Sequence, residues 1–198
     1  MTQRTARLIL VLGAFVAGLV LFSAVLFIVT GRSPAPIALP SSVGGPFRLT
    51  DSNSRSISDH DLKGQPFLVF FGFTRCPDIC PTTLFEVSEI LRKLGPDADN
   101  LKALFVTVDP ERDTAPVLKD YLSSFDPHVV GVTGEPAALA AMAKSYRVYF
   151  KKVPLDGGNY TMDHTAIVYL MDKSGRFVAP FNVKRKPEEA AADLRKYF

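Results

Sequence analysis

The sequence has no excess of positive charge after its first 33 residues. Only three of its 23 Lys and Arg residues, Arg4, Arg7 and Arg32, precede Pro34, and no Asp or Glu does. The other 20 basic residues are matched by 20 acidic ones. Because nucleic-acid affinity depends on clustered Lys and Arg that contact phosphates, this balance gives no electrostatic basis for nucleic-acid binding.

Charge is absent altogether from Leu8 to Val29, a run of 22 residues. A helix needs about 20 apolar residues to cross the hydrocarbon core, so we predict a transmembrane anchor over residues 8–30. A cleaved signal peptide has a shorter apolar core, of roughly 7–15 residues, followed by an A-x-A site that is missing here. A mitochondrial transit peptide is not expected either, because no Arg-rich amphipathic segment precedes the run.

The flanking charges predict how the anchor is oriented. Arg4 and Arg7 precede the run and only Arg32 follows it closely, so the positive-inside tendency places residues 1–7 in the cytoplasm. We expect a single-pass protein of the inner (cytoplasmic) membrane with a periplasmic, extracytoplasmic C-terminal domain. Residues 31–46 hold four prolines among Ser and Gly residues, a composition typical of an extended tether. The folded domain is then residues 47–198.

Strand and helix patterns alternate through this domain. Near-continuous apolar runs, such as residues 66–73, are typical of strands buried on both faces. The alternation, followed by a terminal hairpin and helix, predicts an α/β fold in which helices flank a mixed sheet. The predicted strands are 47–51, 55–57, 66–73, 101–108, 129–132, 148–153, 165–171 and 176–181, and the predicted helices are 82–94, 115–125, 135–146 and 187–197.

The chain has only two cysteines, Cys76 and Cys80, and they follow directly on the apolar run 66–73. Pro81 fits the first turn of the helix that comes next. A helix N-terminus offers free N–H groups and the positive end of the helix dipole, which lower a thiol pKa; Arg75 adds to this expectation. Two sulfurs at this spacing either ligate one metal ion or close a small disulfide.

A plain stabilising disulfide is the structural alternative, because exported domains commonly contain one. However, a bridge across three intervening residues closes a very small loop and restricts the unfolded chain little. A metal-binding or redox role for Cys76 and Cys80 is therefore favoured.

The three histidines differ in their surroundings. His60 and His128 lie in polar, turn-like segments and are interpreted as surface residues. His164 opens the predicted strand 165–171. In a thioredoxin-like order of elements this strand begins beside the cysteine loop, and Asp163-His164 stands where thioredoxins have a cis-proline. The hypothesis from this order is that a ring nitrogen of His164 faces both sulfurs.

Two thiolates and one imidazole suit copper. Thiolate selects Cu(I), and mixed sulfur and nitrogen ligands also hold Cu(II). Zinc remains a chemical alternative, because two cysteines and one histidine also form a catalytic zinc set.

Three motifs together resemble the Sco/SenC family of cytochrome oxidase assembly factors, over roughly residues 47–198. The resemblance implies a thioredoxin fold and a copper ion bound by Cys76, Cys80 and His164. Many relatives have serine at the position of Thr165, and we expect no effect on ligation. The motifs are Cys76-Pro77-Asp78-Ile79-Cys80-Pro81, Thr107-Val108-Asp109-Pro110-Glu111-Arg112-Asp113-Thr114 and Asp163-His164-Thr165.

The same resemblance implies a role in building the binuclear copper centre of cytochrome c oxidase subunit two. The implied partners are that subunit and other copper chaperones, and we expect a metallochaperone rather than an enzyme. One alternative is a thiol–disulfide oxidoreductase that reduces the client's cysteines through Cys76 and Cys80. A redox or copper sensor is another. The spacing of three residues between the cysteines departs from the C-x-x-C of oxidoreductases.

Four polar residues of these motifs have two readings each. Asp109, Arg112 and Asp113 either hold the metal loop or contact a partner, or they form a charged turn in which Asp113 or Thr114 caps the next helix. Asp78 is either solvated or close to the metal.

Overall fold

The computed structural model describes residues 3–30 and 43–198, and the chain divides into two units, residues 1–39 and 40–198. The described part of the first unit is helix α1 (Gln3–Thr30). Among the described residues, no helix is long and apolar enough to cross a membrane, and the anchor over residues 8–30 stays a prediction. Most of the predicted tether, residues 31–42, lies outside the described residues.

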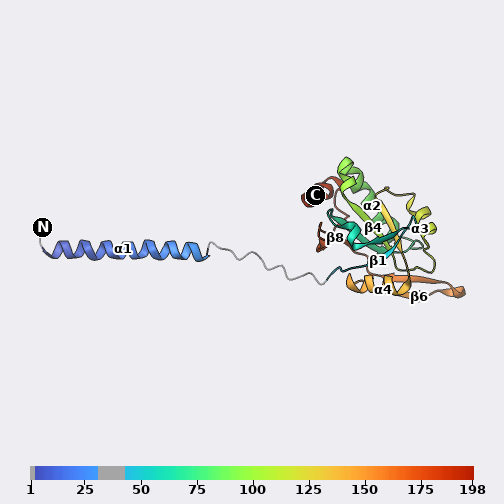
Figure 1. Cartoon of the computed structure of the whole chain (residues 1–198), viewed down its shortest axis with the longest axis horizontal. Helices are drawn as coiled ribbons and strands as arrows, with labels where there is room; N and C mark the ends of the chain where they lie inside the picture. The colour runs from blue at the N-terminus through green and yellow to red at the C-terminus, as the bar shows by residue number, and fades with distance from the viewer. Residues whose placement is uncertain (1–2, 31–42) are drawn as a thin grey trace. The chain divides into compact units, whose positions relative to one another are not determined.

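The second unit is built on a seven-stranded mixed sheet (Figure 1). Its order is β2-β1-β5-β4-β3-β8-β9, in which β3, β4 and β5 are parallel and the other pairs are antiparallel. The predicted α/β class is confirmed. The strands are β1 (Arg48–Asp51), β2 (Ser56–Ser58), β3 (Phe67–Gly72), β4 (Lys102–Thr107), β5 (Val129–Thr133), β8 (Val168–Met171) and β9 (Phe177–Pro180).

Helices cover both faces of the sheet. Helices α2 and α4 lie on opposite faces (Figure 1), and α5 packs against α2. Right-handed crossovers from β3 to β4 and from β4 to β5 put α2 and α3 on the same face. Short 3₁₀ segments complete the unit. The helices are α2 (Ile79–Leu94), α3 (Ala115–Leu122), α4 (Pro136–Ser145) and α5 (Pro187–Leu194), and the 3₁₀ segments are Asp59–Leu62, Gly95–Asn100, Asp156–Gly158 and Arg195–Tyr197.

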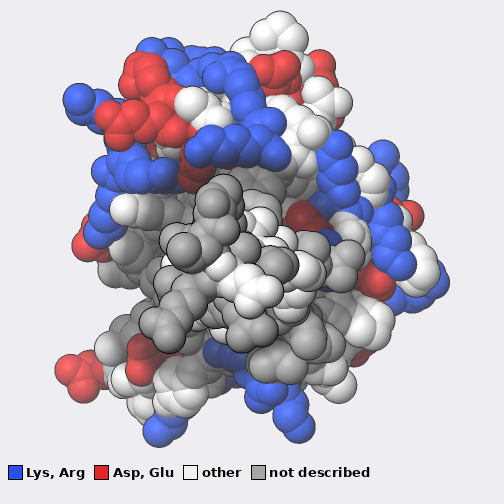
Figure 2. Space-filling view, turned by 90° about the vertical axis from the view of Figure 1, so that its left-hand side faces the viewer, with Lys and Arg blue, Asp and Glu red and all other residues white. Residues whose placement is uncertain are grey.

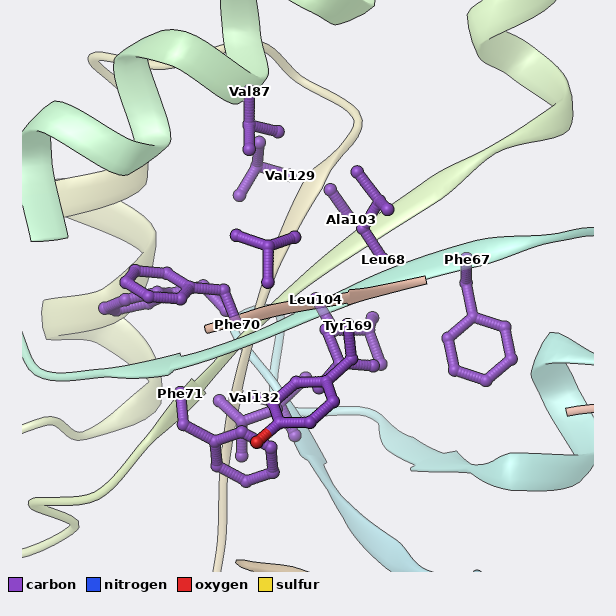
Figure 3. Packing of buried hydrophobic residues seen from close by; sticks show 14 of the residues in the cluster. Phe67, Leu68, Phe70, Phe71, Val87, Ala103, Leu104, Val129, Val132 and Tyr169 are labelled. Atoms are coloured by element: carbon purple, nitrogen blue, oxygen red, sulfur yellow. The ribbon is translucent and has the colours of Figure 1, made fainter. Parts of the chain in front are cut away.

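Strand β3 runs through the centre of the core, and all six of its residues are buried. Because side chains alternate along a strand, Phe70 points to the α2 side and Phe71 to the opposite side (Figure 3). Phe70 packs on Phe105, with ring centroids 5.9 Å apart, whereas Phe71 packs on Tyr146 at 5.5 Å. The face that carries Phe70 also carries the cluster of cysteine and histidine described below.

A separate hairpin follows α4, formed by β6 (Phe150–Pro154) and β7 (Tyr160–His164). Here the sequence prediction is wrong in one respect, because His164 ends β7 instead of opening the strand that becomes β8. Gly157 and Gly158, with φ of 72° and 77°, reverse the chain, so residues 160–164 pair with 150–154. Residues 165–167 then form a connection with no strand assignment.

The surface of the second unit mixes both signs of charge. On the face seen in Figure 2, Lys and Arg side chains lie among Asp and Glu side chains. Ion pairs on the surface of this unit include Lys93 with Glu188 and Arg195 with Asp97. The mixture agrees with the equal numbers of acidic and basic residues after Pro34.

Candidate metal centre

The two cysteines lie where β3 passes into α2. In the connecting loop the N–H of Cys76 donates to the carbonyl of Phe73 at 3.2 Å, and α2 begins at Ile79 with Asp78 as its N-cap residue. Pro81 falls in the first turn, where backbone N–H groups need no partner within the helix. Cys76 is half-buried, and Cys80 is completely buried.

Three donor atoms converge at this junction. The Sγ atoms of Cys76 and Cys80 and a ring nitrogen of His164 all lie within 4.8 Å of one another. Cys80 Sγ is 3.6 Å from His164 Nε2. Both cysteines are free thiols in the structure. The tertiary fold therefore brings together the three residues that the sequence singled out, across 84 positions of chain between Cys80 and His164.

The imidazole of His164 is oriented for ligation. Its Nδ1 lies 3.2 Å from the carbonyl oxygen of Thr165; this oxygen only accepts, so Nδ1 carries the proton and the Nε2 lone pair faces Cys80. The ring stands edge-on to Phe73, with centroids 5.7 Å apart and planes at 89°. Burial lowers the pKa of His164, which keeps the imidazole neutral, as a metal ligand must be.

Burial shifts the pKa of Cys80 upward, in the opposite direction to that of His164. Desolvation of the buried sulfur raises the pKa of the Cys80 thiol far above its ordinary value, and it outweighs a hydrogen bond with the backbone of Phe73. The expectation that the helix N-terminus lowers the thiol pKa is therefore wrong for this residue. Cys80 is a thiol without metal, so binding of a metal ion must release its proton.

Asp113 braces the cysteine loop from the turn between β4 and α3. This buried carboxylate accepts hydrogen bonds from the N–H and the hydroxyl of Thr74, at 3.0 Å and 2.5 Å, and from the Thr107 hydroxyl at 2.7 Å. Thr74 precedes Cys76 by two residues, so Asp113 fixes where the loop begins. Of the capping alternative, the position is confirmed, because Thr114 is the N-cap residue of α3, but Thr114 makes no side-chain capping hydrogen bond. The Asp113 side chain bonds Thr74 and Thr107 and does not cap the helix.

Asp109 and Arg112 contact the hairpin and not the three donor atoms. Asp109 is buried, forms an ion pair with Arg112 and accepts a 2.8 Å hydrogen bond from the Tyr160 hydroxyl. Asp78 is exposed, and its carboxylate accepts a hydrogen bond from the Thr82 hydroxyl at 3.4 Å. Arg75 is exposed as well.

The other two histidines lie away from the donor cluster. His60 has a side chain that is 75% exposed, as predicted. His128 makes more contacts than its interpretation as a surface residue implies. Both of its ring nitrogens have hydrogen-bond partners, Asp126 at 2.7 Å and Asp99 at 3.0 Å. Neither belongs to the group of Cys76, Cys80 and His164.

Sequence reasoning missed three residues that support the site: Thr74, Thr107 and Tyr160. Thr107 lies in the second of the three family motifs, and Thr74 lies two residues before Cys76. Their positions in the sequence could therefore have indicated a role in the site. Nothing in the sequence indicated a role for Tyr160, because it lies 51 residues from its partner Asp109.

The SCO1/SenC family model matches residues 36–198. The chain belongs to the SCO1/SenC family. The resemblance seen in the three motifs is thereby confirmed. Among curated proteins of the family, the SCO2-like protein of Rickettsia felis is 38% identical over 155 residues, which is 77% of this chain and 76% of that protein. The mitochondrial SCO1 homolog of Mus musculus is 41% identical over 155 residues, which is 77% of this chain and 55% of that protein.

Solved Sco structures have the same fold. ScoI of Bradyrhizobium japonicum, solved with copper bound, is 62% identical with a TM-score of 0.78, and the match covers 79% of this chain and 99% of that one. Yeast Sco1 with copper bound is 36% identical with a TM-score of 0.69, and the match covers 79% and 90% of the two chains. The thioredoxin-like mixed sheet with flanking helices is confirmed by these matches.

Proposed function

We propose that this protein binds one copper ion through Cys76 Sγ, Cys80 Sγ and His164 Nε2 and delivers it to the binuclear copper centre of cytochrome c oxidase subunit two. The observation that carries the proposal is the convergence of the three donor atoms within 4.8 Å. Two soft sulfurs and one imidazole are a donor set that suits copper. The Bradyrhizobium and yeast relatives, solved with copper bound, favour copper over zinc.

The site is built for a cargo that must leave again. Bound copper supplies a soft cation that takes the place of the thiol protons. Cys80 is completely buried and His164 is held by Thr165, so these two ligands form the fixed side of the site. Cys76 is half-buried and lies on the loop, so it is the ligand that a client's own thiolate can replace first.

The test is a titration of the reduced full-length chain with Cu(I) against a competing chelator. We expect one tightly held copper per chain, and we expect His164→Ala to weaken it by more than about tenfold, since outer-shell changes alone cost 10–100-fold. His60→Ala is the matched control, because that side chain is 75% exposed and outside the cluster. Oxidation of Cys76 and Cys80 to a disulfide should abolish binding.

Delivery is checked in the same experiment by adding the apo copper domain of subunit two to the loaded protein. Copper should move to the client and form the binuclear centre. Binding that does not depend on His164, or binding that survives oxidation of the two cysteines, would show that the ligand set is wrong. Tight copper binding without transfer would support the proposed ligand set and contradict the proposed client.

We also propose that the protein is anchored in the inner membrane, with its N-terminus in the cytoplasm and its second unit in the periplasm. The support is the uncharged run Leu8–Val29 and the preceding Arg4 and Arg7. In a Gram-negative host the full chain should remain with membranes after a high-salt wash. Protease added to spheroplasts should digest residues 43–198. Recovery of the intact chain in the soluble fraction would contradict the proposal.

Thiol–disulfide exchange is the second candidate, and the unequal exposure of the cysteines favours it. Cys76 is half-buried and its sulfur accepts a hydrogen bond from the Cys80 N–H at 3.4 Å, while Cys80 is completely buried. Such a pair suits an attacking and a resolving thiol. If the reduced chain binds no tight copper but reduces the client's disulfide, this second function replaces the first.

A further inference from the structure

We infer that Asp109, Arg112 and Tyr160 form a clamp that positions His164, by fixing hairpin β6–β7 to the turn after β4. The inference rests on the proposed copper site and adds residues that set the place of its third ligand. His164 is the last residue of β7, so the place of its imidazole depends on the place of the hairpin.

The apolar attachment of the hairpin is limited, with Phe150 and Tyr160 only partly buried against the core. It forms a two-stranded sheet that is not hydrogen-bonded to the seven-stranded one, and Met162 is its only buried residue. An isolated two-stranded hairpin is at best marginally stable in water. Its position must therefore come largely from specific contacts with neighbouring elements.

The clamp supplies such contacts through a closed set of polar interactions. Arg112 Nη1 donates to the backbone carbonyl of Tyr160 at 2.9 Å, and its guanidinium lies over the Tyr160 ring, 3.7 Å from the centroid. The Tyr160 hydroxyl donates to Asp109 Oδ1 at 2.8 Å, and Asp109 Oδ2 pairs with Arg112. Each of the three residues thus contacts the other two.

Burial gives these contacts weight. The side chain of Asp109 is fully buried and that of Arg112 is only 12% exposed, so solvent screens their interaction little. The neighbouring ion pair of Lys152 and Glu111 also joins the hairpin to this turn, at 2.5 Å. Its side chains are 45% and 61% exposed, and pairs of that kind contribute little. The buried clamp is the main polar link.

The clamp and the ligand lie at opposite ends of one strand. Tyr160 and His164 are four residues apart on β7, or about 13 Å at 3.3 Å per residue. A hairpin released at Tyr160 is still held at its base, where the Thr165 N–H donates to the Tyr149 carbonyl at 2.9 Å, and it can rotate about that point. His164 lies beside this base, so the rotation changes the direction of its side chain more than the position of its backbone. Because ligand geometry must hold within about 0.5 Å, a small rotation takes Nε2 out of place.

The same turn also reaches the cysteines. Asp113 follows Arg112 directly and holds Thr74, two residues before Cys76. Residues 109–113 therefore connect to both halves of the site, to the histidine through Tyr160 and to the cysteines through Thr74. Asp109 and Arg112 are positioning residues that act through His164, and neither contacts the donor atoms.

A double-mutant cycle on the full-length chain tests this. Arg112→Ala should weaken Cu(I) binding about tenfold in the wild-type background, within the range for lost outer-shell partners, and less than about twofold when His164→Ala is already present. Nitrogen hyperfine coupling in the Cu(II) spectrum should weaken in Arg112→Ala. Arg176→Ala, which breaks an exposed ion pair with Asp172, is the control and should change neither readout. Equal losses in both backgrounds would overturn the clamp.

Hydrogen exchange of the copper-free chain gives a readout that does not depend on the proposed function. Tyr160→Phe removes only the hydroxyl that donates to Asp109 and keeps the packing of the ring. It should speed exchange of the β6–β7 amides by at least about threefold and leave β3 and β4 unchanged. Unchanged hairpin exchange would reject the clamp even if copper binds. If the wild-type protein binds no copper, the proposed function is rejected. The hydrogen-exchange measurement would still show whether the clamp holds the hairpin.

Discussion

Replacing Cys80 with serine is expected to remove tight Cu(I) binding from the protein. The substitution takes away one of the two sulfurs in the cluster and puts a hard hydroxyl oxygen in its place, which Cu(I) binds poorly. The loss should exceed about 100-fold, the upper end of what a lost outer-shell partner costs. It is measured by competition with a Cu(I) chelator under reducing, oxygen-free conditions.

The control for Cys80→Ser must separate lost ligation from lost folding. Cys80 is completely buried, and a Cβ placed on Gly72 would lie 2.8 Å from its sulfur, so the position is tightly packed. Urea unfolding without copper should therefore show a folded variant of somewhat lower stability. His128→Ala, which changes a residue bonded to Asp126 and Asp99, should keep its copper. A comparable copper loss in both variants would refute the site.

Asp113→Ala is expected to cause the largest loss of stability among the site variants. It removes the acceptor of the Thr74 N–H, the Thr74 hydroxyl and the Thr107 hydroxyl. Thr107 is 1% exposed, so its hydroxyl cannot turn to water, and each unsatisfied buried group costs roughly 1–3 kcal/mol. The free energy of unfolding should fall by about 3 kcal/mol, measured with urea on residues 33–198, which contain the whole compact unit.

Two further variants show whether the lost hydrogen bonds cause this effect. Asp113→Asn keeps one acceptor oxygen and gains a donor that the Thr107 hydroxyl can accept, so it should lose clearly less stability than Asp113→Ala. Adding Thr74→Val to Asp113→Ala removes the half-buried Thr74 hydroxyl, which has lost its acceptor, and should recover up to about 1 kcal/mol. Thr107 is left unchanged, because its hydroxyl oxygen also accepts the buried Asp109 N–H at 2.9 Å. If Asn and Ala cost the same and Val recovers nothing, the brace on the cysteine loop is not what Asp113 provides.

Local patterns in the sequence determined most of the second unit. The apolar run 66–73 predicted β3 because a strand buried on both faces must be apolar at every position. The spacing of Leu84, Val87, Ile90, Leu91 and Leu94 predicted α2, and all five residues are buried along it. The cysteines and Pro81 at the strand-to-helix junction follow from these two patterns, because they lie between them in the chain.

Only the tertiary structure decided how the histidine reaches the sulfurs. No local pattern encodes that residues 160–164 pair with 150–154 and leave His164 at the end of a hairpin. The contact of Tyr160 with Asp109 spans 51 residues, and side-chain contacts over such a separation depend on how the elements pack.

The protonation of Cys80 was decided in the same way. Sequence position suggested a lowered thiol pKa at the start of a helix, but burial in the core raises it instead. Burial is a property of the assembled fold, because the atoms that exclude water from Cys80, including Phe105 beside Gly72, come from distant segments. The sequence by itself therefore determined which residues form the site, and the packing of the fold decided their charge state and geometry.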